Sequence, residues 1–317
     1  FVPHVAEAAA STVVFQRTPN WFLPADNYHD DLADGVQWLI RSVPGFAQWY
    51  RLFLFWRMHE GLLPAARVDP EWVSETGSVS MMNELIREFL LAKLRTDFAD
   101  DPEMLDRVTP RYPPIAKRAL LDNGSWAATL LRDDVELCTD AIARITPRGV
   151  ETVDGTLHEV DVIIYGTGFT ASDFLVPMQL GGRRGVELHE RWGGDARAYL
   201  GITVPDFPNL FLLYGPNTNI VINGSIIYFS ECEVRYLVES VRLLLEGPHQ
   251  AMAVRPEVHD EFGRAVDAEN ERMVWGAADV NSWYKNASGR VAQNWPFTLI
   301  DYWRRTLRPD PADYELT

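Results

Sequence analysis

Two short apolar segments that each end at glycine constrain the fold of this chain most strongly. The first, residues 161–169, reads as a buried strand followed by the turn Gly166-Thr167-Gly168. The second, residues 207–217, is another apolar run that breaks at Gly215. Glycine at the end of a strand lets the backbone approach a flat ligand closely, so this pattern is typical of α/β nucleotide enzymes. The sequence therefore predicts an α/β fold.

Composition limits the class of protein and its partners. The chain has 317 residues, of which 47% are hydrophobic and 12% aromatic, enough for two domains with cores. Its formal net charge of −16 argues against a nucleic-acid surface, which needs clustered Lys and Arg. No apolar run reaches the roughly 18 residues of a membrane span, and Cys138 and Cys232 lack the spacing of a zinc or redox motif. We expect no metal site, no membrane partner and a cytoplasmic location.

The first residues read as the helix and the second strand of a βαβ unit. Residues 1–10 carry apolar side chains at helical spacing with no capping residue before them, and residues 12–15 are strand formers. In a dinucleotide fold a Gly-x-Gly-x-x-Gly turn comes just before this helix, and the chain contains no such motif. We therefore expect that the N-terminal part of the fold is missing from this chain.

Three stretches predict long helices. Residues 31–63 and 80–98 are amphipathic and rich in Trp, Phe, Leu and Arg. Residues 225–246 have the clearest helical spacing, with Ser225 as a possible cap and Gly247 as a stop. Short strands are expected at 135–138, 142–145 and 149–153, where the pattern alternates.

Several motifs of the chain resemble those of the flavin-dependent Baeyer-Villiger monooxygenases. In chain order they are Phe15-Gln16-Arg17-Thr18-Pro19-Asn20-Trp21, Ala116-Lys117-Arg118, the two glycine-terminated segments, Ser282-Trp283-Tyr284 and Gln293-Asn294-Trp295-Pro296-Phe297. The resemblance runs nearly end to end. It is closest to the branch that includes hydroxyacetophenone monooxygenase, with which Lys285 agrees.

The resemblance implies the C-terminal half of an enzyme that uses FAD and NADPH. Its fold would be α/β, with two dinucleotide-binding (Rossmann-like) domains, a helical insertion and an N-terminal part missing from this chain. Residues 1–24 and 110–157 would belong to the NADPH-binding domain, residues 25–109 to the helical insertion, and residues 158–317 to the FAD-binding domain.

Arg17 stands just past a strand, where the second strand of a dinucleotide fold meets the adenosine ribose. An acid at this place accepts the 2′-hydroxyl of NAD, whereas an arginine pairs with the 2′-phosphate of NADP. The plain alternative is a solvated arginine at the end of a strand. The match of residues 16–19 to the family's phosphate-binding segment implies NADPH, with Thr18 as a further hydroxyl donor.

Lys117 and Arg118 follow Pro113 and Pro114, whose rings stiffen the segment. Two adjacent like charges repel, so a fold that points both inward needs an anion between them; a solvated surface pair is the alternative. The resemblance implies that Lys117 lies near the nicotinamide nucleotide and that Arg118 lies beside the flavin. There the guanidinium fork would hold a flavin peroxide and its adduct with a ketone, which makes Arg118 the expected catalytic residue.

The other expected cofactor contacts also follow from the resemblance. Trp283 matches a tryptophan whose indole N–H reaches the bound nucleotide, although tryptophan is more often a core residue. Gly166, Gly168, Asn217 and Ile226 would border the flavin. The free N–H groups at the start of the helix near Ile226 suit the electron-rich edge of a reduced flavin, and an ordinary core helix explains the same pattern equally well.

The function implied is insertion of one oxygen atom next to a ketone carbonyl, with a ketone or aromatic ketone and O2 as substrates and the missing N-terminal half as partner. Oxygenation of nitrogen or sulfur is the alternative, because the fingerprint that separates the two classes is not in this chain. A non-catalytic fragment of such an enzyme is another. No serine stands in a Gly-x-Ser-x-Gly elbow, so a hydrolase finds no support.

Overall fold

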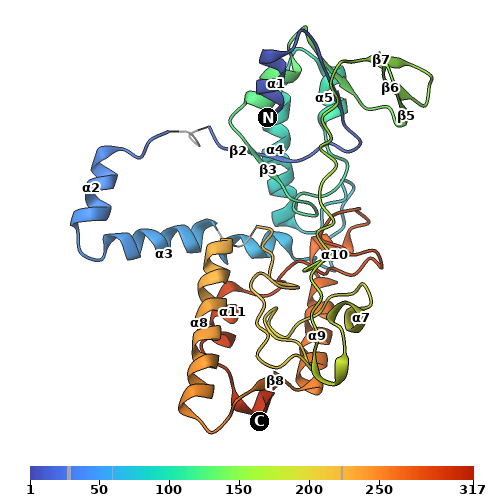
Figure 1. Ribbon diagram of the computed structural model, residues 1–317. Helices are drawn as coiled ribbons and strands as arrows, with labels where there is room; N and C mark the ends of the chain where they lie inside the picture. Colours follow the sequence, from blue (N-terminus) through green and yellow to red (C-terminus); the bar gives the residue numbers. More distant parts are fainter. Residues whose placement is uncertain (27–29, 59, 223) are drawn as a thin grey trace.

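The computed structural model describes residues 1–26, 30–58, 60–222 and 224–317, which form an upper and a lower body (Figure 1). The N-terminus lies in the upper body and the C-terminus in the lower one (Figure 1). Helices α2 (Asp34–Ser42) and α3 (Phe46–Met58) extend from the junction as an arm (Figure 1).

The upper body joins helices to small sheets. Its helices are α1 (Val2–Ala8), α4 (Met81–Asp97), α5 (Pro102–Val108) and α6 (Ser125–Leu130). Its strands are β1 (Thr12–Phe15) with β4 (Val135–Cys138), β2 (Phe22–Pro24) with β3 (Leu120–Asp122), and the sheet β5 (Ile142–Thr146), β6 (Gly149–Thr152) and β7 (Leu157–Glu159). The first two pairs are parallel and the three-stranded sheet is antiparallel, so the fold is mixed α/β. Trp21, Leu90 and Leu137 lie in the core of this body.

The lower body is built around α8 and α9. Its elements are η2 (Arg183–Gly185), α7 (Leu188–Trp192), α8 (Ile226–Glu246), β8 (Met252–Val254), α9 (Pro256–Asn270), α11 (Leu299–Arg305), η3 (Pro311–Asp313) and β9 (Tyr314–Leu316). Aromatic side chains dominate its core: the rings of Phe229 and Tyr302 lie 4.4 Å apart, and those of Trp295 and Tyr302 lie 4.8 Å apart. Each such pair stabilises the body beyond the burial of its area.

A third apolar cluster joins the two bodies. It contains residues of η1 (Glu60–Ala66) and α10 (Val274–Ala277) together with Ile115 and Tyr284. The Glu60 carboxylate also accepts hydrogen bonds from the backbone N–H groups of Leu299 and Ile300, both at 3.1 Å. An acid at the first turn of α11 suits the partial positive charge of a helix start. The junction therefore brings segments far apart in sequence to one place.

Most of the expected helices and strands are present. α4 and α8 agree with the predicted ranges, and Ser80 and Ser225 cap them through their hydroxyl groups. Strand β1 lies where strand-forming residues predict it, and β4, β5 and β6 lie where alternation predicts them. The stretch 31–63 is not one helix, because Val43 is extended and Gly45 has a φ of 80°, which separates α2 from α3; His59 of this stretch is outside the described residues. None of the helices in the described ranges is both long and apolar enough to cross a membrane.

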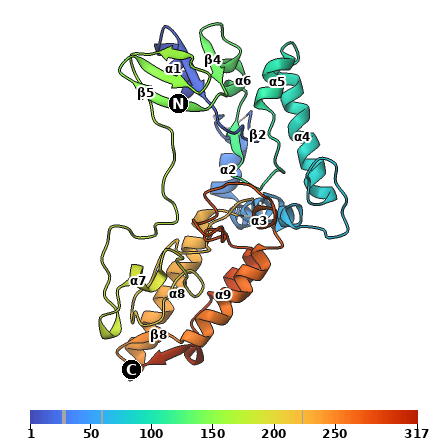
Figure 2. The same ribbon diagram turned by 90° about the vertical axis from the view of Figure 1, so that its right-hand side faces the viewer.

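The predicted buried strand at 161–165 is wrong. This segment is unpaired in the structure, and Val162, Tyr165 and Phe169 have exposed fractions of 74%, 67% and 96%. It belongs to the long connection that descends from the upper to the lower body (Figure 2). A buried parallel strand needs hydrogen-bonded neighbours, and the described residues offer none here. Gly168 of the predicted turn does adopt a backbone conformation that favours glycine, with a φ of 87°.

The second glycine-terminated segment is not a strand either. Phe207 and Leu212 are buried, and the backbone N–H of Leu212 donates to the Ile202 carbonyl at 2.8 Å, but no ladder continues from this bond. The glycine at 215 has a clear cause: a Cβ there would lie 2.1 Å from the carbonyl oxygen of Gly201. The apolar pattern thus reflects packing of an irregular loop against its neighbour.

Candidate functional site

Arg17 is presented at the end of the parallel pair β1 and β4. The backbone N–H of Gln16 donates to the Cys138 carbonyl at 2.9 Å, and the Gln16 side chain donates to the Arg107 carbonyl at 3.3 Å. These bonds fix the backbone directly before Arg17, whose side chain is exposed, and Thr18 beside it is half-buried. The strand pair therefore holds Arg17 at its carboxyl end.

Lys117 lies next to an aromatic pair that joins two distant segments. The indole N–H of Trp21 donates to the Tyr112 carbonyl at 2.9 Å, and the Tyr112 hydroxyl donates to the Pro19 carbonyl at 3.1 Å. The Lys117 ammonium lies 5.2 Å from the centre of the Tyr112 ring, a cation–π contact. Burial, and next the charge of Arg17, lower the pKa of Lys117. The two cations are thus electrostatic neighbours.

Arg118 is exposed, and its charge affects the pKa of two tyrosines from other parts of the chain. Burial raises the pKa of Tyr284 and that of Tyr214, and the charge of Arg118 opposes the shift at both. Both hydroxyls therefore stay protonated at neutral pH. Tyr284 is fully buried, and its hydroxyl has no hydrogen-bond partner in the described part of the chain.

Trp283 lies at the surface beside this group. Its side chain is 41% exposed, and its ring packs edge-on against that of Tyr284 with 4.7 Å between the centres. The Lys285 ammonium donates to the Ala278 carbonyl at 2.9 Å, which ties down the backbone on the other side. The segment 283–285 is thus anchored, and part of the Trp283 side chain is exposed.

Arg17, Lys117 and Arg118, together called the cation cluster below, have no acidic partner among the residues that the structure describes. None of the three forms an ion pair with any residue in the ranges that the structure describes. The chain carries a net charge of −16, so carboxylates are plentiful. Neighbouring cations without counterions, next to tyrosine hydroxyls, form a site suited to a phosphate or another anion.

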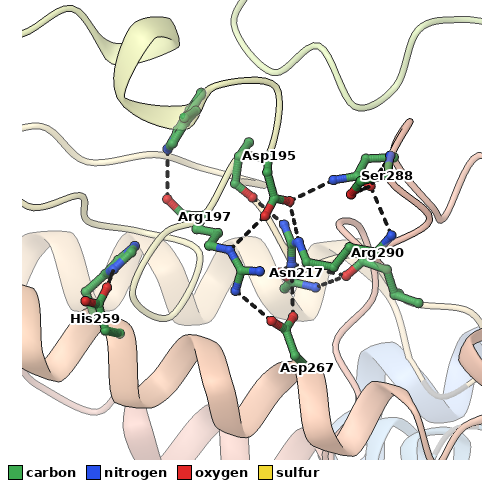
Figure 3. A network of polar contacts seen from close by, with 12 residues as sticks. Asp195, Arg197, Asn217, His259, Asp267, Ser288 and Arg290 are labelled. Atoms are coloured by element: carbon green, nitrogen blue, oxygen red, sulfur yellow. Dashed lines mark hydrogen bonds and ion pairs between the residues drawn. The ribbon is translucent and has the colours of Figure 1, made fainter.

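Asn217 lies in a different polar network, in the lower body (Figure 3). Its side-chain amide donates to the carbonyls of Val291, at 2.8 Å, and Asn294, at 3.2 Å, and its side-chain oxygen accepts from Arg290 at 3.2 Å. All polar atoms of this side chain are therefore engaged with protein groups. Asn217 joins the loop 214–219 to the segment 290–294, which makes it a structural brace in this conformation.

Two arginines and two aspartates surround this brace, and we call Asp195, Arg197, Asp267 and Arg290 the ion network (Figure 3). Arg197 pairs with Asp195 at 3.0 Å and with Asp267 at 2.7 Å, and Arg290 pairs with the same two carboxylates. Burial raises the pKa of Asp195, but Arg290 and Arg197 outweigh it and leave this pKa below its ordinary value. Every charge in the ion network has an opposite partner.

The remaining expected flavin contacts lie elsewhere. Ile226 is the first residue of α8 and packs against the lower core, and Gly166 and Gly168 lie in the exposed connection 161–170. Among the described residues, no hydrogen bond or ion pair joins any of these three to the cation cluster. Within the described ranges, no group of His, Cys, Asp and Glu side chains is arranged to hold a metal ion.

Comparison with known proteins shows which proteins this chain resembles. No family model matches it. It is 33% identical over 314 residues to an uncharacterized monooxygenase, y4iD, of Sinorhizobium fredii, covering 99% of this chain and 47% of that protein. It is 33% identical over 319 residues to the FAD-binding monooxygenase ktnD of Aspergillus niger, covering 50% of it, and 29% identical over 318 residues to a Baeyer-Villiger monooxygenase of Pseudomonas aeruginosa, covering 57% of it. The chain thus spans about half the length of the curated relatives it matches.

Solved structures show the same fold. A cyclohexanone monooxygenase from Rhodococcus sp. Phi1 bound to NADP+ superposes with a TM-score of 0.79 at 22% identity, covering 100% of this chain and 64% of the other. An oxidized steroid monooxygenase bound to NADP gives a TM-score of 0.75 at 23% identity, covering 99% and 64%. The mixed α/β fold of this chain is therefore that of monooxygenase structures.

Sequence analysis did not find the three tyrosines of the site. Tyr112, Tyr214 and Tyr284 lie beside the cation cluster, yet each reads in the sequence as an ordinary aromatic core residue. The one signal was their position: Tyr284 follows Trp283, and Tyr214 stands directly before a glycine turn.

Proposed function

We propose that this chain carries the nucleotide and oxygenation sites of an FAD- and NADPH-dependent monooxygenase of the Baeyer-Villiger type. The observation that carries the proposal is the cation cluster, in which three cations lack counterions within the described part of an acidic chain. The names of the relatives, which include FAD-binding and Baeyer-Villiger monooxygenases, support it. NADP in the similar structures supports the choice of nucleotide.

The nucleotide side of the site is assigned to the upper body. In the proposal, Arg17 pairs with the 2′-phosphate of NADPH and Thr18 donates its hydroxyl to the same group, because a guanidinium fork fits phosphate oxygens. Lys117 binds the nicotinamide nucleotide as a point charge, and Trp283 contacts it through its indole. The lowered pKa of Lys117 fits this role, since a bound phosphate would restore the stability of the ammonium form.

Arg118 is the proposed catalytic residue. FAD, when bound, supplies the redox chemistry and the activation of O2. The guanidinium fork of Arg118 would stabilise negative charge that develops on oxygen while a ketone is converted to an ester. The charge of Arg118 reaches both Tyr214 and Tyr284. The Tyr214 hydroxyl already donates to Asn219 and Tyr284 is buried, so in this conformation Arg118 is the donor that the proposal assigns to the developing charge.

The flavin side requires a further polypeptide in this proposal. Gly166 and Gly168 lie in an exposed apolar segment, and α8 exposes a stripe of side chains at heptad-like spacing, Ile227, Val234, Val238, Val241 and Leu245. Exposed apolar surfaces of this kind mark interaction sites. We infer that both are covered by an α/β segment of a further polypeptide, the N-terminal half of such an enzyme. Asn217 and Ile226 would then border the flavin.

Domain organisation and substrate follow as parts of the same proposal. Residues 1–24 and 110–157 would serve NADPH, residues 25–109 would be a helical insertion, and residues 158–317 would serve FAD. Lys285 and its neighbours favour the hydroxyacetophenone branch, hence an aromatic ketone. The contact of Lys285 with the Ala278 carbonyl gives this residue a role in holding the Trp283 segment.

Product analysis tests the proposal. The protein that carries this chain is supplied with FAD, NADPH, O2 and an aromatic ketone, and the ester is detected by mass spectrometry with 18O2 as the oxygen source. We expect one labelled oxygen in the ester, and loss of ester with Arg118→Ala. Arg111→Ala serves as the matched control, because Arg111 pairs with Asp106 at the surface near the same segment. Oxygenation of an amine or sulfide, with no ester from any ketone, would contradict the proposal.

A further inference from the structure

The loop 214–217 contains two residues in an uncommon backbone conformation. Tyr214 has a φ of 55° and Asn217 a φ of 60°, in the left-handed region that non-glycine residues rarely adopt. For a bulky residue such as tyrosine this conformation is strained and persists only where neighbouring groups hold it. The two residues are held in different ways.

Asn217 has several anchors, whereas the main chain of Tyr214 has one side-chain anchor. Asn217 is fixed by the ion network and by its own amide bonds. The backbone N–H of Tyr214 donates to the carboxylate of Glu233 at 3.0 Å, and the Tyr214 hydroxyl donates to Asn219 Oδ1 at 2.8 Å. Glu233 is therefore the group that fixes the backbone at the strained residue.

Glu233 occupies an unusual position for a carboxyl group. It lies on the buried face of α8 between Phe229 and Tyr236, with an exposed fraction of 0%. Burial raises its pKa, an effect only partly offset by hydrogen bonds from the Tyr214 N–H, the Tyr302 hydroxyl and Thr218. No ion pair with a described residue compensates the charge. A buried carboxyl without a cation is costly, so an apolar residue would make this helix face more stable.

We propose that Glu233 is a positioning residue of the oxygenation site, whose buried carboxyl holds Tyr214 in the left-handed conformation and thereby keeps its ring beside Arg118. The effect of Glu233 on oxygenation rests on the proposed function, whereas its effect on the backbone of Tyr214 does not. Glu233 touches no ligand in this role. It acts through Tyr214, whose pKa feels both Glu233 and Arg118.

Amide hydrogen exchange tests the backbone consequence on the chain itself. In Glu233→Leu we expect the Tyr214 amide to exchange at least about tenfold faster, while Glu233→Gln, which keeps an acceptor oxygen, retains most of the protection. Glu231→Gln is the matched control, because Glu231 lies on the same helix but pairs with Arg51 at the surface. Unchanged exchange of the Tyr214 amide in Glu233→Leu, or equal loss in the Gln and Leu variants, would overturn the proposal.

A double-mutant cycle keeps the test decisive if Glu233→Leu folds poorly. Glycine adopts a positive φ without strain, so Tyr214→Gly needs no anchor. We expect Glu233→Ala, which removes the acceptor, to lower the free energy of unfolding less in the Tyr214→Gly background than in the wild type; equal losses would refute the anchor.

Enzyme assays then test the consequence at the site. Glu233→Leu should lower kcat for ester formation with little change in KM for NADPH, and Glu233→Gln should rescue it. A kcat unchanged in Glu233→Leu, despite fast exchange of the Tyr214 amide, would overturn the role of Glu233 in the site. Absence of ester already in the wild type would instead refute the proposed function. The contact between Glu233 and the Tyr214 backbone would then be tested by the exchange data alone.

Discussion

The ion network and the cation cluster place arginines in opposite electrostatic situations. Arg197 and Arg290 each pair with two carboxylates, and the Arg290 side chain is only 12% exposed. Arg17, Lys117 and Arg118 have no such partner among the described residues, although Arg17 and Lys117 are close enough to affect each other. Paired arginines stabilise the loops of the lower body. In the proposed function, the cations without a carboxylate partner among the described residues bind the cofactor.

This difference shows that charge alone does not identify a site. Both regions are rich in arginine, and both lie where distant segments meet. What separates them is whether each cation already has its counterion, because a satisfied guanidinium gains little from an added anion. Each prediction below alters one side of this comparison.

The largest effect is expected at Arg118. Arg118→Ala removes one preorganised donor to a developing oxyanion, which should cost about 2.7–4 kcal/mol of transition-state stabilisation. The rate of ester formation should therefore fall by roughly two to three decades. Arg118→Lys should rescue little, since lysine lacks the rigid fork. Steady-state product assays measure this. A variant with the wild-type rate of ester formation would remove Arg118 from the catalytic role.

Arg290→Met should chiefly destabilise the fold. It leaves the carboxylates of Asp195 and Asp267 and the oxygen of Asn217 without this donor, so we expect a loss of about 2–3 kcal/mol in the free energy of unfolding. Denaturant titration measures it. Arg242→Met, in an exposed pair with Glu239, is the control and should cost less than about 1 kcal/mol. Equal losses in the two variants would mean that the ion network does not stabilise the fold more than an exposed ion pair does.

Arg17→Ala should change the choice of nucleotide. Removing a charge-assisted pair with the 2′-phosphate should weaken NADP+ binding by about 1.5–3 kcal/mol, or about one to two decades, and leave NAD+ binding nearly unchanged. Calorimetric titration of both nucleotides measures the ratio. If both affinities fall equally, Arg17 does not face the 2′-phosphate.

The smallest effect is a pH dependence at Lys117. Burial and Arg17 disfavour its ammonium form and lower its pKa in the folded protein, so folding stability should rise as pH increases through this lowered pKa towards the ordinary value. NADP+ affinity should change in the opposite direction, because a phosphate favours the ammonium. We expect the affinity to fall by less than about tenfold between about pH 7 and about pH 10. Lys117→Arg, which stays charged, should abolish this slope; an identical slope in the variant would assign it to another group.

The sequence was sufficient for the elements whose signals are local. α4 and α8 have apolar side chains at helical spacing and serine caps, and β1 is a run of β-branched residues, so each was predicted where it forms. Arg17 and Lys117 were predicted as cofactor contacts on separate motifs, and the structure brings them together without testing what they bind.

The remaining features depend on contacts between distant residues. The apolar pattern at 161–165 predicts a strand, but a strand forms only when neighbours complete its hydrogen bonds, and none of the described segments does so. Asn217 is a brace because Arg290, far along the chain, donates to it. Tyr284 stands in a motif that the sequence singles out, but that its hydroxyl lacks a partner among the described residues and lies near Arg118 is visible only in the fold.

The central claim, that Arg17 and Lys117 of the cation cluster bind the phosphate groups of NADPH, is tested most directly by titrating NADP+ and NAD+ into the wild-type protein and into a variant with Ala at positions 17 and 117. Arg197 and Arg290 stay intact in this variant, so its free energy of unfolding should match that of the wild type and report that the fold is preserved. The wild type should bind NADP+ more tightly than NAD+, and the variant should lose both that preference and most of its affinity. Equal NADP+ affinity in the two folded proteins would contradict the account.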